Sequence, residues 1–204
     1  MKFRSAATFA IAVAAIGLVA GPSGAVPITY RAILDGPSES PPNSSLGTGT
    51  AIIVLDSDTN FLSISASFAG LSAPTTVAHI HCCTAIPLTA TVGVAVTPTT
   101  LPGFPAGVTA GTYDIAFSPL VVANFTGGFL STFGGGTVDG AVDALEAAFN
   151  SGRAYFNVHT TTSPGGEIRG FIAPVPVPAT ALLFGAALTT LGLTRYRRRS
   201  EAAA

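Results

Sequence analysis

Three histidines occur in this chain, and their spacing predicts that they share one site. His79 and His81 lie two residues apart in an apolar segment typical of a β-strand, so both side chains point to the same face. His159 ends a second predicted strand, residues 153–159. An H-x-H pair with a distant third histidine is a common ligand set for zinc or copper, so these residues are candidate metal ligands.

The segment that carries His159 predicts which residues accompany it. Residues 153–159 and 167–172 alternate apolar and polar side chains across a short turn, so we expect a β-hairpin. Its even-numbered apolar residues must face the core. The opposite face then gathers a polar set: Tyr155, Asn157, His159, Glu167 and Arg169.

Two interpretations of this polar face remain open from the residues alone. In the first, the three histidines bind copper or zinc, and Glu167 is a neighbouring group. In the second, the histidines donate hydrogen bonds to backbone carbonyls, and Glu167 pairs with Arg169 or Arg153.

Cys82 and Cys83, the only cysteines, follow the H-x-H pair directly. In an oxidising compartment they form a vicinal disulfide. As thiols beside His81 they instead add soft ligands for copper or zinc. The sequence does not decide between these two states.

Catalysis without a metal has no support in the sequence. No Ser-His-Asp order, paired-carboxylate motif or phosphate-cradling loop is present, and Gly134–Gly136 lacks the strand and helix of a dinucleotide fingerprint. We therefore expect a non-enzymatic binding or structural module. The alternative is a copper- or zinc-binding protein with redox activity.

The middle of the chain has the period-two pattern of an all-β fold. We expect an immunoglobulin-like or Greek-key sandwich or barrel of about eight strands, with one short helix over residues 138–149 that Gly152 ends. The predicted strands are residues 29–34, 49–55, 60–68, 77–81, 92–96, 113–117, 153–159 and 167–172.

The N-terminal 25 residues are typical of a secretory signal peptide. Lys2 and Arg4 precede an apolar block at residues 6–20, and small residues lead to a predicted cleavage between Ala25 and Val26. An uncleaved N-terminal anchor is the alternative, but the apolar block is shorter than the ~20 residues that span a bilayer.

The C-terminal residues 174–204 have the pattern of a sorting tail. An apolar segment, predicted to be a transmembrane helix at residues 177–194, is followed by Arg195, Arg197, Arg198 and Arg199. The positive-inside rule puts these arginines in the cytoplasm and the domain outside. A buried core helix is the alternative, although an arginine cluster makes its burial costly.

Between these ends, residues 26–173 form one predicted domain with a strong acidic balance. Three arginines stand against nine acidic residues, a formal charge of −6, whereas the whole chain is −1. Nucleic-acid binding requires a basic face, so this class of function is excluded.

The tail resembles the PEP-CTERM sorting signal of Gram-negative bacteria. The resemblance covers residues 175–199, with a motif of Val175, Pro176, Val177, Pro178 and Ala179, and departs where Val177 replaces the usual Glu. It implies an exosortase-type processing enzyme as a partner, transient anchoring in the inner membrane, and delivery to the envelope or extracellular polymer.

The domain itself resembles the CHRD, or chordin-like, family. The motifs fall in the family's order: YRAILDG at 30–36, ESPP at 39–42, GTG at 47–49, FAGL at 68–71, AHIH at 78–81, YFNVH at 155–159 and GGEIRG at 165–170. Cys82 and Cys83 depart from it, since Gly and Pro usually follow HIH. The resemblance implies an exported, matrix-associated β-domain without a defined molecular activity.

The H-x-H strand also resembles that of copper/zinc superoxide dismutase. This likeness is limited, because three histidines cannot supply that enzyme's two-metal site.

Overall fold

The structure is a computed structural model that describes residues 26–176. The signal-peptide prediction up to Ala25 and the predicted transmembrane helix and arginine cluster lie outside the described residues. Among residues 26–176, no helix is both long and apolar enough to cross a bilayer.

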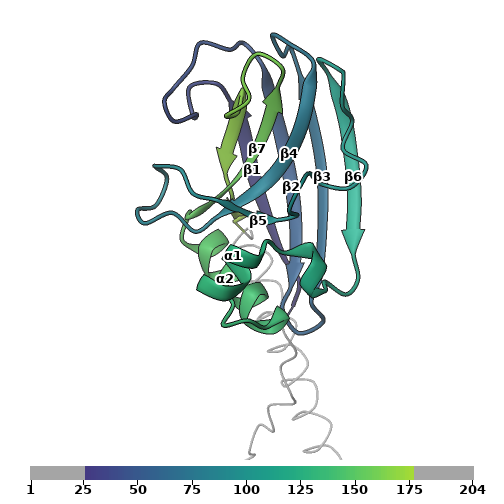
Figure 1. Cartoon of the computed structure of the whole chain (residues 1–204), viewed down its shortest axis with the longest axis vertical. Helices are drawn as coiled ribbons and strands as arrows, with labels where there is room; N and C mark the ends of the chain where they lie inside the picture. Colours follow the sequence, from purple (N-terminus) through teal and green to yellow (C-terminus); the bar gives the residue numbers. More distant parts are fainter. Residues whose placement is uncertain (1–25, 177–204) are drawn as a thin grey trace, which may run out of the picture.

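The domain is mostly β, and its strands form one antiparallel sheet that curls into a half-barrel (Figure 1). The path across the sheet is β5-β4-β7-β8-β1-β2-β3-β6, and β9 pairs with β1. The strands are β1 (Ile28–Asp35), β2 (Thr48–Asp56), β3 (Phe61–Ala69), β4 (Thr75–Cys82), β5 (Val94–Val96), β6 (Gly111–Phe117), β7 (Ala154–Thr160), β8 (Ile168–Phe171) and β9 (Ala173–Pro174).

The eight strands predicted from the sequence are β1 to β8. The prediction of a mostly β fold of about eight strands is therefore confirmed. The strands build one continuous curled sheet rather than two separate ones. The chain crosses from β3 to β4 and later returns through β7 and β8 to the other side of β1. The short β9, the 3₁₀ helix Val122–Asn124 and helix α1 (Gly127–Thr132) were not predicted.

Alternation of side chains decides which face of the sheet becomes the core. On β3, Leu62, Ile64, Ala66 and Phe68 are buried, while Ser65 and Ser67 between them are exposed. The antiparallel register pairs these residues with apolar ones on β2, such as Ile53 opposite Ile64. Because side chains point alternately to the two faces of a strand, this pattern fixes the orientation of the sheet.

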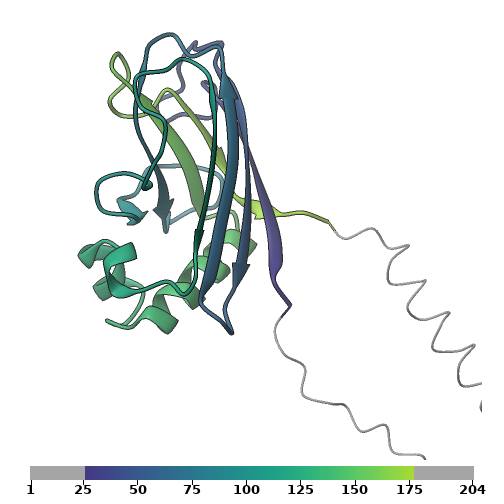
Figure 2. The same cartoon turned by 90° about the vertical axis from the view of Figure 1, so that its right-hand side faces the viewer.

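Helix α2 (Val138–Asn150) covers one end of the core, as the sequence predicts (Figures 1 and 2). Thr137 caps it by accepting a hydrogen bond from the backbone N–H of Gly140, and Gly152 beyond its end has a φ of +66°, which favours glycine. Its buried Phe149 ring lies 5.0 Å from the ring of Tyr30 on β1. The helix therefore packs its apolar face against the inner side of the sheet.

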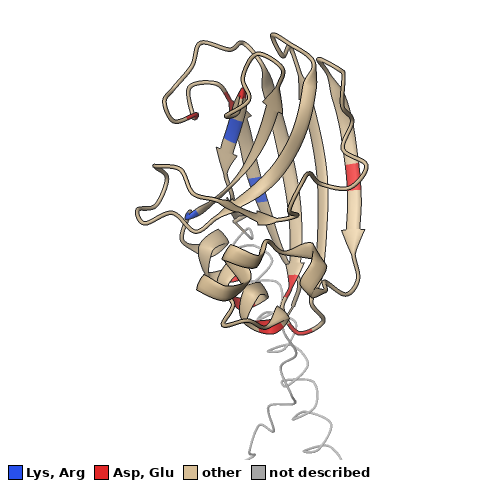
Figure 3. Ribbon diagram, viewed as in Figure 1, with Lys and Arg blue, Asp and Glu red and all other residues tan. Residues whose placement is uncertain are grey.

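Charged side chains are few, and acidic ones prevail (Figure 3). Several acidic residues lie at the end of the domain that carries α2, in the figure's lower part. Asn60, beside the β2–β3 turn, donates to Asp139 of α2 at 2.8 Å and ties these two parts together. The three arginines of the described residues, Arg31, Arg153 and Arg169, lie on different elements of the fold.

Candidate metal centre

The candidate site lies on the outer face of β4, β7 and β8. The register sets His79 opposite Asn157, and Asn157 opposite Arg169 on the next strand. His81 lies opposite Tyr155 in the same way. The shared parity predicted from the sequence is therefore present, and the pairing of β4 with β7 brings the H-x-H strand beside the hairpin.

The three histidines converge from these strands. One nitrogen from each of His79, His81 and His159 lies within 4.8 Å of the other two. His79 Nδ1 and His159 Nε2 are 3.3 Å apart. All three side chains are buried, with exposed fractions of 7, 9 and 7%.

The second nitrogen of each ring faces a backbone carbonyl in a different loop. His79 Nε2 lies 2.9 Å from the Thr99 carbonyl oxygen, His81 Nδ1 lies 2.8 Å from that of Val92, and His159 Nδ1 lies 2.9 Å from that of Pro164. A carbonyl oxygen only accepts, so each of these nitrogens must carry the proton and donate. In the neutral rings the lone pairs are then on His79 Nδ1 and His159 Nε2, which are 3.3 Å apart, and on His81 Nε2.

Burial keeps the rings neutral. Loss of solvation lowers the pKa of His79 and of His159, and it lowers the pKa of His81 to about 4. The neighbouring imidazoles and Arg169 lower the pKa of His81 further. Its Nε2 is buried and has no hydrogen-bond partner among the described residues.

Tyr155 packs against His81, and Arg169 packs against Tyr155. The His81 and Tyr155 rings are stacked with centroids 4.7 Å apart and an angle of 5° between planes. The guanidinium carbon of Arg169 lies 4.7 Å from the Tyr155 centroid, a cation–π geometry. Arg169 also donates hydrogen bonds to the carbonyls of Ser38 and Ala90. These bonds hold the loop that contains Ser38 and the loop that contains Ala90 against this face.

These two loops bury the polar face, which the parity argument alone left open to solvent. They comprise residues 36–47 and 83–93 and stand out at the left of Figure 1, the first in purple and the second in blue-teal. Every residue of β7 is therefore buried: Phe156 and Val158 in the core on one face, and the polar residues under the loops on the other.

Glu167 lies on this face but is not part of the histidine cluster. Its carboxylate accepts from the Ser45 hydroxyl at 2.7 Å, the Ser72 backbone N–H at 2.6 Å and the Thr160 hydroxyl at 2.7 Å. Burial alone raises its pKa, but these hydrogen bonds together outweigh that effect and lower it. The expected ion pair of Glu167 with Arg169 or Arg153 is wrong, because hydroxyl and amide donors already satisfy this carboxylate.

The ion-pair partner of Arg169 is Glu39, which the site prediction missed. Their side chains are 3.8 Å apart and nearly fully buried. Burial raises the pKa of Glu39 to about 7, although Arg169 acts to lower it. Its Oε1 and the Asn157 Oδ1 are buried without a partner among residues 26–176. The sequence signal that could have identified Glu39 is the ESPP motif at residues 39–42, which places an acidic residue in a turn.

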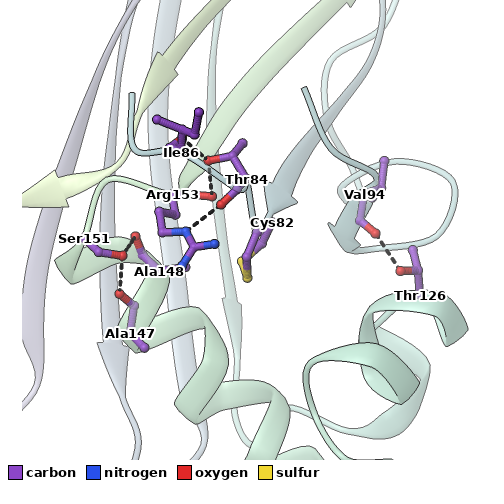
Figure 4. Close-up of a disulfide and its surroundings, with 10 residues drawn as sticks. Cys82, Thr84, Ile86, Val94, Thr126, Ala147, Ala148, Ser151 and Arg153 are labelled. Atoms are coloured by element: carbon purple, nitrogen blue, oxygen red, sulfur yellow. Dashed lines mark hydrogen bonds between the residues drawn. A yellow bond between two sulfur atoms is a disulfide. The ribbon is translucent and has the colours of Figure 1, made fainter. Parts of the chain in front are cut away.

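Cys82 and Cys83 form a disulfide (Figure 4). Cys82 is 2% exposed and belongs to the hydrophobic core, on the side of β4 opposite His79 and His81. The hypothesis that these residues add thiol ligands is therefore wrong: strand alternation turns Cys82 away, and the sulfur atoms are bonded to each other. In Figure 4 the disulfide lies near Arg153, whose side chain donates to the Thr84 carbonyl.

The processing motifs fall at the edges of the described residues. Val26, the predicted first residue of the mature chain, is 77% exposed. Val175 and Pro176 are also exposed, and the Val175 backbone N–H donates to the Thr29 carbonyl at 3.0 Å, so the chain enters and leaves the sheet side by side (Figure 2). Val177, Pro178, Ala179 and the four arginines lie outside the described residues.

The family model of the CHRD domain matches residues 30–172 of this chain. The chain belongs to the CHRD domain family. The match starts in β1 and runs beyond the end of β8, so it includes all three histidines and both loops over them. At the level of the family, it supports a secreted, extracellular module. No curated protein and no solved structure matches this CHRD chain.

Proposed function

We propose that this protein is an exported, non-enzymatic binding module whose CHRD domain holds one transition-metal ion, copper or zinc, between His79, His81 and His159. The observation that carries the proposal is the convergence of three imidazole lone pairs, each fixed by a hydrogen bond from the other ring nitrogen to a carbonyl. Such bonds orient metal-ligating histidines and set their tautomer.

A purely hydrogen-bonded role for the histidines fits this geometry poorly. His79 Nδ1 and His159 Nε2 are 3.3 Å apart, yet neither carries a proton while both rings keep their carbonyl bonds. A hydrogen bond between them requires a protonated ring, and burial lowers the pKa of both. A metal ion resolves the conflict by accepting both lone pairs.

The spacing agrees with metal coordination. Imidazole nitrogens bind zinc at about 2.0–2.1 Å, so two ligands of a tetrahedral or trigonal ion are separated by about 3.3–3.6 Å. The 3.3 Å between the His79 and His159 nitrogens lies in this range. Small rotations of the rings bring the widest separation in the cluster, at most 4.8 Å, closer to it.

We further propose that the chain reaches its place of action through its two ends. The N-terminal 25 residues act as a signal peptide, and residues 175–199 act as a PEP-CTERM-type tail that an exosortase-type enzyme removes. The domain is thereby passed from the inner membrane to the envelope or extracellular polymer. The positions of Val26 and Val175 support this proposal. Both residues lie outside the strands, so cleavage of the chain near them leaves the sheet intact.

Metal analysis of the full chain, purified in detergent, tests the metal proposal. After loading with copper or zinc and removal of free metal, we expect one ion per chain in the wild type and none in His81→Ala. Ser65→Ala, on an exposed part of the sheet, is the matched control and should keep one ion. Equal metal content in wild type and His81→Ala, or none in either, contradicts the proposal.

The sorting proposal has a separate test. Replacing Arg195, Arg197, Arg198 and Arg199 with glutamine removes the positive flank that fixes orientation in the membrane. We expect this variant to be retained or missorted, as measured by cell fractionation. Normal delivery to the surface would contradict the proposed signal.

A further inference from the structure

The charge balance around the three histidines points to the ion they select. We propose that the site prefers copper(I), a monovalent ion, over zinc(II). This inference rests on the metal site proposed above and adds the identity and charge of its ligand.

The ligand set carries no negative charge. The three converging nitrogens belong to neutral imidazoles, whose remaining N–H groups are engaged by the carbonyls of Thr99, Val92 and Pro164. No carboxylate or thiolate of the described residues belongs to this cluster. A dication bound here keeps its full charge of +2 inside a buried site.

The positive charge of Arg169 is also unfavourable to a dication. The guanidinium of Arg169 lies over the Tyr155 ring, and the other partner of that ring is His81. Glu39 pairs with Arg169 at 3.8 Å, but burial raises the pKa of this carboxyl to about 7, so it offsets the charge of Arg169 only in part. The anionic Glu167 directs both oxygens to Ser45, Ser72 and Thr160 and away from the metal cluster.

Three physical effects then separate the two ions. The cost of taking an ion out of water grows with the square of its charge, and repulsion from Arg169 grows with its first power. Zinc also seeks a fourth ligand, which this set of three histidines does not supply. All three terms favour copper(I) in a neutral, buried set of three histidines.

A competition experiment on the full chain in detergent tests this. Equimolar copper(I) and zinc(II) are offered to the protein without oxygen, and the bound metal is quantified. We expect copper(I) to occupy the site. Zinc in equal or greater amount overturns the inference but leaves the metal site standing, while binding of neither ion overturns the proposed function itself.

Arg169 variants show whether charge is the cause. Arg169→Gln removes the positive charge, and we expect zinc affinity to rise about tenfold but copper(I) affinity only about threefold, since the dication feels twice the repulsion. Arg169→Lys loses the planar guanidinium but keeps the positive charge, so its ratio of affinities should stay near that of the wild type.

Equal ratios in the two Arg169 variants contradict the charge argument. If the Arg169 variants do not fold, the charge argument is tested instead by measuring how zinc binding by the wild type depends on the anion of the added salt. Chloride, an anion able to become the fourth ligand of zinc, should strengthen zinc binding. Zinc binding that is independent of chloride, sulfate and phosphate also overturns the inference.

Discussion

The outer face of the sheet differs between its two halves. On β2 and β3 it carries small hydroxyl and aliphatic side chains, and Ser65 and Ser67 are exposed to solvent. On β4, β7 and β8 the same face carries histidine, asparagine, glutamate and arginine, and all of them are buried. One sheet thus presents an open polar surface on one half and a covered, hydrogen-bonded polar layer on the other.

This difference shows how buried polar side chains indicate a candidate site, because burying a polar group costs free energy unless the fold supplies a partner. An exposed serine needs no partner, because water satisfies it. A buried charged or amide group is stable only if the fold supplies partners, and here two loops do so through Ser38, Ser45, Ala90 and Val92. His81 Nε2 is buried and has no hydrogen-bond partner among the described residues, and the metal ion proposed above would accept its lone pair.

The largest expected effect that sharpens this comparison concerns Glu167. Glu167→Ala leaves the Ser45, Ser72 and Thr160 donors without their acceptor, so we expect a loss of roughly 3–5 kcal/mol in the free energy of unfolding. Urea denaturation measures this loss. Glu167→Gln keeps the shape of the side chain and part of its hydrogen bonding, so its free energy of unfolding should fall by less. A change below 1 kcal/mol in the alanine variant would show that the covered layer is not held by this carboxylate.

Acid should weaken the covered half of the sheet in the metal-free protein. The pKa of His81 is about 4 in the fold and about 6.5 when unfolded, so the unfolded state binds the proton first. Its contribution is complete above pH 6.5 and is lost as pH falls to about 4, a change of about 3 kcal/mol. His79 and His159, whose pKa values are also lowered, act in the same direction.

Glu39 opposes this trend, which gives a control for the acid effect. Its pKa is raised to about 7 in the fold from 4.5, so its contribution is complete below pH 4.5 and is lost as pH rises through 7. In urea denaturation between pH 4 and 7, Glu39→Gln should therefore steepen the loss of stability toward acid, while His81→Gln should flatten it. Parallel curves for all three proteins would refute the assignment.

A pair of adjacent glycines tests how tightly the covered layer is packed. Gly166 has a φ of +127°, and a Cβ on it would lie 2.5 Å from Glu39 Oε1 and 2.6 Å from Asn157 Oδ1. We expect Gly166→Ala to lose roughly 2 kcal/mol in the free energy of unfolding. Gly165→Ala, where a Cβ meets nothing within 4 Å, should change it by less than ~1 kcal/mol. Thermal unfolding of the two variants measures the contrast, and equal losses would argue against close packing there.

The smallest effect belongs to the open half. Ser65→Ala removes an exposed hydroxyl, and we expect the free energy of unfolding to change by no more than ~0.5 kcal/mol. The same urea titration measures it. A loss above 1 kcal/mol would break the comparison, because it would mean that this face also depends on its polar groups.

Much of the fold was predictable because it depends on local pattern. Period-two alternation located β1 to β8, and the apolar spacing with Gly152 located α2. β9 and α1 escaped because two- and six-residue elements are too short to show a period. The ESPP motif marked Glu39 as a family residue, but nothing in its spacing said that it would meet Arg169, 130 residues away along the chain.

By itself, the sequence determined that His79, His81 and His159 share the outer face of their strands, because side-chain direction follows residue parity. It also determined the acidic balance and the order of the family motifs. Only the tertiary structure decided that β4 lies beside β7, that two loops bury this face and that Cys82 turns into the core. It also fixed which ring nitrogen of each histidine faces a carbonyl. These features depend on strand pairing and loop contacts between residues far apart in the chain, and no local pattern encodes such contacts.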